Sequence, residues 1–206
     1  ATTIDINGAI NASGEIIAAS LDISGDIDVD GTTNLDIVDV DGAVNFAADV
    51  TFADGADIIT ASAGTSNFRA GVNAGNSIAS GGTNNVFVGD EAGTANTTAD
   101  HNTALGYGTL SSDTLGQANV AIGSQALATQ NFTSSTDSYN TAVGRKAGYA
   151  VTTGVKNTLI GGLVGDSITT ANNNTAVGYN SLTANTTGAA NVALGSIASF
   201  KNTTAS

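Results

Sequence analysis

The pentapeptide Asn174-Thr175-Ala176-Val177-Gly178 recurs through the C-terminal part of this chain, and its spacing decides the fold. Successive copies lie 17, 17, 21, 17, 17 and 17 residues apart. Chance does not produce five equal intervals, so the segment is a structural repeat. Copies of the pattern Asn-(Val/Thr)-x-(Val/Leu/Ile)-Gly begin at Asn85, Asn102, Asn119, Asn140, Asn157, Asn174 and Asn191.

Each copy predicts a short β-strand. The residue after Asn is always Val or Thr, and the residue two positions further is Val, Leu or Ile. Side chains two apart share one face of a strand, and β-branched residues suit that pleated surface. The intervening residue is usually Ala, so we expect the opposite face to approach a neighbour closely. Burying this Ala face against other chains would favour association.

Every strand is followed by glycine, which predicts a sharp turn, a positive φ or a close backbone approach. These glycines are Gly89, Gly106, Gly123, Gly144, Gly161, Gly178 and Gly195. Three residues later comes a mostly small residue, usually followed by Leu or Gly, which predicts a second short strand. The rest of each repeat is Ser, Thr, Asn, Gly and Ala, a turn composition.

Two short strands and two turns in 17 residues predict one coil of a β-solenoid. A helical repeat is excluded because β-branched residues, Gly and Asn fill every copy without a 3.6-residue period. The repeated Asn should fall at one corner and form a ladder of side-chain hydrogen bonds between coils. The looser match at Asn67–Gly71 predicts an atypical first coil. We therefore assign residues 63–206 to an all-β solenoid of 17-residue coils.

The single interval of 21 residues marks an insertion of four. It falls within 130–138, which predicts a polar loop bulging from the solenoid. Phe132 and Tyr139, with the adjacent bases Arg145 and Lys146, form a candidate contact surface beside this loop. The alternative interpretation of these residues is a solvated corner.

Charge divides the 206 residues into two parts. Residues 1–62 contain twelve acids and no Lys or Arg, whereas residues 63–206 are nearly neutral within a net charge of −13. Residues 1–62 also alternate acidic and β-branched positions, as in 26–31, so we predict a strand-rich segment. Five scattered bases offer no footprint for nucleic-acid phosphates, and no apolar run is long enough to span a membrane. The lack of Cys excludes disulfides and thiolate metal sites.

Candidate chemical sites are weak. Asp26, Asp28 and Asp30 fit the start of an EF-hand loop, but the twelfth position is Ile37, so a solvent-facing strand is favoured over a weak Ca²⁺ site. His101 follows Asp100, yet its slot before the motif Asn accepts Asn, Ala, Tyr and Lys elsewhere, which indicates an exposed corner. We therefore expect neither an enzyme nor a cofactor.

The repeats at 174–182 and 191–195 resemble head repeats of YadA-type trimeric autotransporter adhesins, and still more the related repeats of phage tail fibres. The stretch 21–31 is similar to shafts of marine phage tail fibres. This resemblance implies a parallel homotrimer in an extracellular virion fibre, which joins other fibre or tail proteins and presents binding to a host receptor. A bacterial surface adhesin or filament is the alternative. A third is an ice-binding solenoid, although Thr is scattered over corners such as 96–98 and 185–187.

Overall fold

A computed structural model describes residues 40–41, 44, 60 and 62–199. The chain divides into two units, Ala1–Thr51 and Phe52–Ser206, and the architecture below is that of the second unit. The expected strand-rich segment of residues 1–62, with Asp26, Asp28 and Asp30, lies almost entirely outside the described residues.

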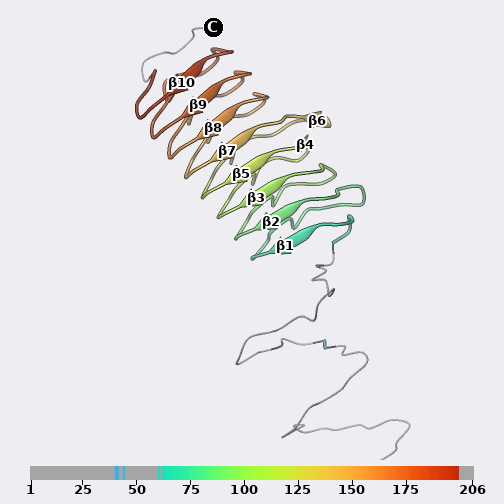
Figure 1. Ribbon diagram of the computed structural model, residues 1–206. Helices are drawn as coiled ribbons and strands as arrows, with labels where there is room; N and C mark the ends of the chain where they lie inside the picture. The colour runs from blue at the N-terminus through green and yellow to red at the C-terminus, as the bar shows by residue number, and fades with distance from the viewer. Residues whose placement is uncertain (1–39, 42–43, 45–59, 61, 200–206) are drawn as a thin grey trace, which may run out of the picture. The chain divides into compact units, whose positions relative to one another are not determined.

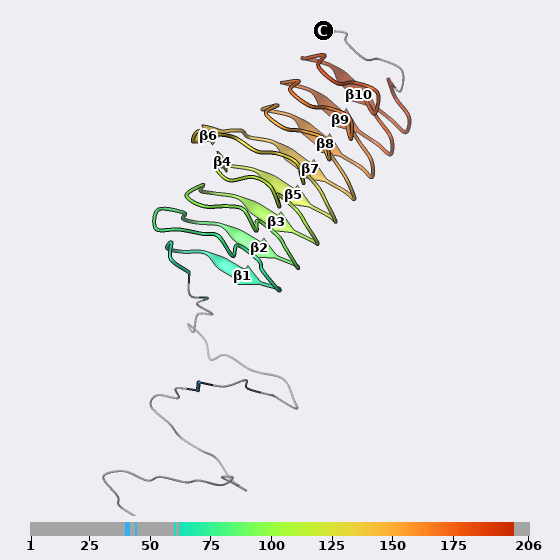
Figure 2. The same ribbon diagram turned by 180° about the vertical axis from the view of Figure 1, so that it is seen from behind.

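The described part of the second unit is a parallel β-solenoid, as expected from the repeat (Figures 1 and 2). Eight strands form one sheet in the order β1-β2-β3-β5-β7-β8-β9-β10. Each motif residue pairs with the same motif residue of the next coil, for example Thr158 with Thr175. The strands are β1 (Phe68–Ala70), β2 (Val86–Val88), β3 (Thr103–Leu105), β5 (Val120–Ile122), β7 (Thr141–Val143), β8 (Thr158–Ile160), β9 (Thr175–Val177) and β10 (Val192–Leu194). The predicted atypical first coil is therefore confirmed by β1.

A second strand in every coil was expected, and this prediction is wrong. The residues after each motif glycine form turns, in which non-glycine residues such as Gln125 and Leu127 have φ values of 62° and 50°. An extended strand cannot pass through such positions. Strand pairing away from the main sheet is limited, within the described residues, to β4 (Gly116–Gln117) with β6 (Thr136–Asp137) and an isolated bridge between Thr65 and Thr83.

The orientation of the strands also corrects an expectation. The Ala positions face the interior of their own chain: Ala104, Ala121 and Ala142 are fully buried. The Ala face is therefore already covered without a second chain. The β-branched and aliphatic residues on either side of each Ala point outward and remain partly exposed.

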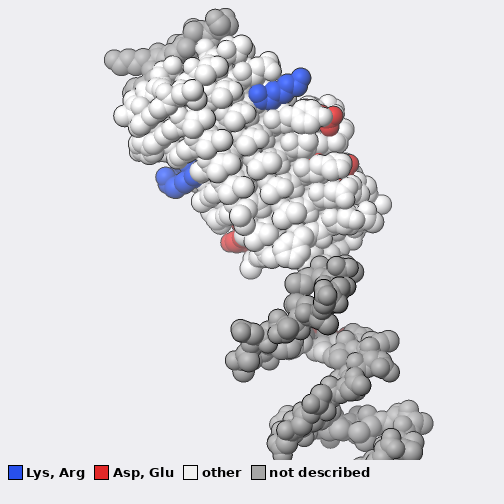
Figure 3. Space-filling view, in the orientation of Figure 1, with Lys and Arg blue, Asp and Glu red and all other residues white. Residues whose placement is uncertain are grey.

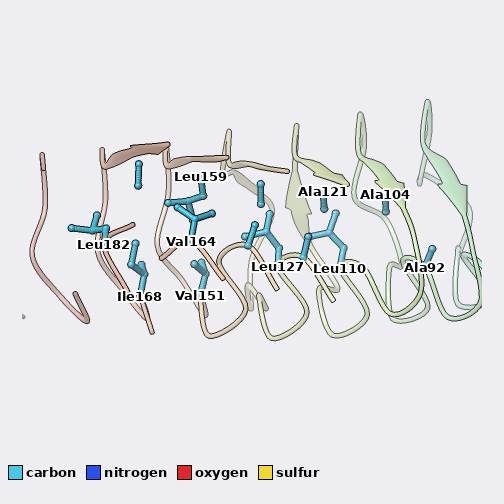
Figure 4. Packing of buried hydrophobic residues seen from close by; sticks show 14 of the residues in the cluster. Ala92, Ala104, Leu110, Ala121, Leu127, Val151, Leu159, Val164, Ile168 and Leu182 are labelled. Carbon is cyan, nitrogen blue, oxygen red and sulfur yellow. The ribbon is translucent and has the colours of Figure 1, made fainter. Parts of the chain in front are cut away.

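The thin core is filled by exchanging volume between two walls (Figure 4). Where the strand supplies only Ala, the facing turn supplies a buried leucine: Leu110, Leu127 and Leu182. Where the strand supplies Phe87 or Leu159, the turn position is Gly93 or Gly165. A Cβ on Gly93 would lie 2.7 Å from the Phe87 ring, and one on Gly165 would lie 2.9 Å from Leu159 Cδ2. Because interiors tolerate neither voids nor overlap, a large residue on one wall requires a small one opposite.

The motif glycines stack directly on one another. Gly123 has φ +111°, and a Cβ on it would lie 2.7 Å from the carbonyl carbon of Gly144 in the next coil. Both predicted reasons for glycine, a positive φ and a close backbone approach, are therefore met at this position.

The motif asparagines form the expected ladder, but inside the coil. Asn85 to Asn174 are at most 1% exposed. In seven consecutive steps from Asn67 to Asn191, each backbone N–H donates to the Oδ1 atom of the preceding ladder Asn at 2.9 to 3.2 Å. The amide nitrogen donates to a carbonyl across the coil, as from Asn157 Nδ2 to Ala171 O at 2.9 Å. Each side chain thus closes its own coil and fixes the next.

The ladder continues across the insertion. Asn119 Oδ1 accepts from Asn140 N at 3.2 Å and also from Ser138 Oγ at 2.9 Å. The hydroxyl of Ser138 therefore adds a second bond at the one step where the interval is 21 residues.

Volume exchange in the core predicts that a coil can be converted from one packing pattern to the other. We expect Phe87→Ala to destabilise the protein by about 3 to 5 kcal/mol, since it leaves a cavity beside Gly93. The double variant Phe87→Ala/Gly93→Leu copies the Ala104 and Leu110 pattern of the next coil and should recover a substantial part of this loss. Chemical denaturation measures both effects, and a double variant no more stable than Phe87→Ala would contradict this account of the core.

Removal of one ladder side chain should be costly. Asn157→Ala leaves the backbone N–H of Asn174 and the carbonyl of Ala171 buried without their ladder partners. At about 1 to 3 kcal/mol for each unsatisfied group, the free energy of unfolding should fall by about 2 to 6 kcal/mol. Asn173→Ala is the matched control, because Asn173 is the exposed neighbour and Ala already occupies its equivalent at Ala190. Equal losses in the two variants, measured by denaturation, would rule out a dominant role for the ladder.

Candidate interaction surface

The outer face of the eight-stranded sheet is the largest regular surface of the described chain. It consists of two columns of side chains, the first and third residue of each strand. The first column contains Phe68, Val86, Thr103, Val120, Thr141, Thr158, Thr175 and Val192. The second contains Ala70, Val88, Leu105, Ile122, Val143, Ile160, Val177 and Leu194. Twelve of these sixteen residues are apolar and none is charged, so the face is suited to contact rather than to solvation.

Exposure confirms that this face is uncovered in the single chain. Leu105 is 44% exposed, and Ile160 and Val86 are each 39% exposed, although each is flanked by residues of neighbouring coils. With a strand spacing of about 4.8 Å, seven steps give a strip about 34 Å long. Exposed Val72, Tyr107 and Tyr179 lie just beyond the motif glycines. They widen the apolar strip along one edge.

Charged side chains lie at the lateral margins of the solenoid, and the surface between them in this view carries none (Figure 3). One margin follows the motif glycines and carries Asp90, Glu91, Arg145 and Lys146. Lys146 Nζ lies 5.0 Å from the centroid of the Tyr149 ring, a cation–π geometry. The charges therefore border the regular sheet and do not interrupt it.

The four residues proposed as a contact surface are not brought together. Phe132 is 6% exposed, and its ring packs over Gly116, where an added Cβ would lie 2.8 Å from Phe132 Cδ2. It anchors the insertion and cannot act as a surface contact. Tyr139 precedes β7, whereas Arg145 and Lys146 follow it, so they occupy opposite corners of the coil. The expected bulging loop is reduced to exposed 133–135 between buried Phe132 and the pairing of Thr136 in β6.

The corner before the ladder asparagines tolerates many residues. His101 is exposed, with φ 60°, and its Nε2 atom lies 3.5 Å from Asn84 Nδ2. Oδ1 of Asp100 accepts instead from the backbone N–H and the hydroxyl of Thr83, at 2.6 and 2.9 Å. The prediction of an exposed corner at His101 is confirmed.

Threonines on the outer face were missed as a group by sequence reasoning, which placed Thr at the corners. Thr141, Thr158 and Thr175 are consecutive in the first column, beside Val143, Ile160 and Val177 in the second. The signal was present in the motif itself, because its second position is Val or Thr. A regular array of hydroxyl and methyl groups therefore covers three neighbouring coils.

Comparison with protein families, with curated proteins and with solved structures finds no match to this chain. Among the described residues, no group of His, Cys, Asp or Glu side chains is arranged to hold a metal ion. No helix in the part that the structure describes is long and apolar enough to cross a membrane.

Proposed function

We propose that this chain is a structural fibre protein that assembles as a parallel homotrimer through the outer face of its sheet. The supporting observation is the uncharged, mainly apolar strip formed by the two outward columns. A monomer would leave this strip in water over the whole length of the solenoid, and contiguous exposed apolar surfaces of this kind are typical of interaction sites.

Threefold symmetry suits the periodicity of the strip. Parallel copies around one axis place equivalent coils at the same height, so each apolar column meets apolar columns along its length. The charged margins at Asp90, Glu91, Arg145 and Lys146 would then border the contact rather than enter it. Burial of the strip also removes the long uncovered sheet face that would otherwise favour unspecific association.

Together with the sequence resemblance, this assembly supports a tail fibre of a phage. In this proposal the protein is extracellular as part of the virion, joins other fibre or tail proteins, and spaces and presents binding to a host-cell receptor. The solenoid supplies stiffness because every coil is bonded to the next through backbone and ladder hydrogen bonds. A bacterial trimeric surface adhesin or filament subunit fits the same geometry and is the alternative setting.

Ice binding is a second candidate function, favoured by the Thr column. Thr141, Thr158 and Thr175 would repeat a hydroxyl every 4.8 Å or so, beside a column of aliphatic side chains. Ordering water on this array requires the same face to stay open. The two candidates therefore differ in oligomeric state, since a trimer would bury the face that ice binding needs.

Native mass distinguishes the candidates. We expect light scattering to give about three times the 20.1 kDa chain mass. Ile160→Glu places a carboxylate in the middle of the proposed contact and should convert the trimer largely to monomer while leaving the far-UV circular dichroism spectrum unchanged. Thr153→Glu adds the same charge at an exposed turn away from the sheet, and should remain trimeric.

A wild-type mass of 20.1 kDa would reject the homotrimer. Thermal hysteresis in solution, reduced by Thr158→Leu, would then support ice binding. Dissociation by Thr153→Glu as readily as by Ile160→Glu would reject the outer face as the contact surface.

A further inference from the structure

A column of side chains inside the solenoid changes from apolar to polar and back. It occupies the same turn in seven coils, where the backbone N–H donates to the carbonyl three residues earlier, as from Asn96 to Gly93 at 3.0 Å and from Gln130 to Leu127 at 3.2 Å. The column is Ile78, Asn96, Asp113, Gln130, Val151, Ile168 and Asn185, and every member is at most 7% exposed. Three adjacent coils thus carry a buried polar group, Asn96–Asp113–Gln130, for which the fibre function gives no reason.

Asp113 is held on one side by four groups of its own and the following coil. Its Oδ1 atom accepts from the backbone N–H of Gly116 at 2.9 Å and, more weakly, from that of Phe132 at 3.4 Å. Its Oδ2 atom accepts from Gln130 Nε2 at 2.5 Å, and Gln130 Oε1 accepts from the ladder residue Asn140 at 2.8 Å. Asp113 is thereby connected to the Asn ladder at the coil that carries the insertion.

The other side of Asp113 is occupied by Asn96, whose Oδ1 atom is buried and has no hydrogen-bond partner. The equivalent Asn185 uses both ends of its amide on Gly188, accepting from its N–H at 2.9 Å and donating to its carbonyl at 2.8 Å. At Asn96 the corresponding residue is Ala99, whose carbonyl accepts from the ladder residue Asn85 instead. No donor of its own turn therefore serves Asn96 Oδ1.

The stack limits what can satisfy Asn96 Oδ1. Its neighbours in the column, about 4.8 Å away along the stack, are apolar Ile78 on one side and Asp113 on the other. An unpaired acceptor next to an ionised carboxylate in a dry core would carry two desolvation costs. A single proton on Asp113 removes both, because the carboxylic acid becomes a donor.

We propose that Asp113 keeps its proton in the folded protein and donates a hydrogen bond to Asn96 Oδ1, so that three coils are joined by one acid-dependent lock. The lock consists of Asn96, Asp113 and Gln130, and it extends to the ladder through Asn140. Since it lies within one chain, it does not depend on the oligomeric state.

The electrostatics of the site agree with this geometry. Burial raises the pKa of Asp113 above its ordinary value of 3.8, and hydrogen bonds from Gln130, Gly116, Phe132 and Leu115 only partly oppose the rise. The side chains that meet Asp113 in the column are neutral amides, and the ring that covers its turn is Phe132. The titratable neighbours Asp100 and His101 lie at the solvent-accessible corner before β3.

The pH dependence follows from the sign of this shift. An acid with a raised pKa in the folded state binds its proton more tightly when folded than when unfolded. The folded state is therefore favoured most below about pH 4, and its advantage is lost as the pH rises through the folded-state pKa. Within this window the unfolding equilibrium constant should rise by up to about tenfold per pH unit.

The test compares wild type with Asp113→Asn in the full chain, by denaturation between pH 4 and pH 8. Asn cannot titrate, so we expect wild type to lose stability relative to Asp113→Asn as the pH rises. Asp90→Asn, which alters an exposed acid at the corner, should follow wild type throughout. A wild type that gains stability relative to Asp113→Asn with rising pH, or a constant difference, would overturn the proposal.

A second measurement keeps the test decisive if Asp113→Asn does not fold. The side-chain carboxyl carbon of Asp113, observed by NMR in ¹³C-aspartate-labelled wild type, should remain at the position of a protonated acid at pH 6, where exposed aspartates are ionised. A carboxylate signal for Asp113 at that pH would overturn the proposal without any variant.

Discussion

The buried asparagine ladder is the interaction on which the solenoid depends. A coil of 17 residues is too small to satisfy its corner by backbone pairing alone, since the chain reverses direction there and leaves buried N–H and C=O groups. One asparagine supplies an acceptor to the next coil and a donor across its own coil. Asn has both functions on a short side chain, whereas Asp lacks the donor and Ser the reach. The invariance of Asn within the repeat follows from this double requirement.

The ladder fixes the coil spacing, and the remaining features adapt to it. Stacked glycines such as Gly123 allow successive turns to approach to backbone contact, and the core must then fit between one short strand and one turn. The core adjusts by placing its large residue on either wall, as Phe87 with Gly93 or Ala104 with Leu110. The insertion is tolerated because Phe132 covers Gly116 and Ser138 reinforces the ladder, so the extra residues cost the next coil nothing.

Much of this architecture could be predicted from sequence, because the periodic residues have single functions. The Asn column, the Gly column and the position of the insertion were all predicted from spacing. The direction of the strand was not, since alternation defines two faces but does not say which one is inside. The exchange of Phe87 and Leu159 for Ala at the middle strand position was the available signal, because large apolar residues at that position belong in a core.

Other features lie beyond pattern reasoning for physical reasons. Leu110, Leu127 and Leu182 adopt φ values of 47° to 53°, a conformation that intrinsic preference disfavours and that only the closed coil enforces. A second strand was expected there because residue type suggested extension, whereas chain closure required turns. The candidate contact of Phe132 with Arg145 failed for a similar reason, since closeness in sequence did not reveal that one coil places them in its core and at its margin.

The repeat also separates what the fold requires from what it leaves free. Ladder, glycine and core positions are restricted in every coil, and the outer columns accept only Thr or apolar residues apart from size. The corners before the ladder, by contrast, hold Asn84, His101, Tyr139 and Lys156 in one equivalent position with the same backbone conformation. Charge and aromatic character can therefore change along these corners without loss of packing. If the sheet faces assemble the fibre, differences in what individual coils recognise are confined to the corners and to the short exposed segment 133–135.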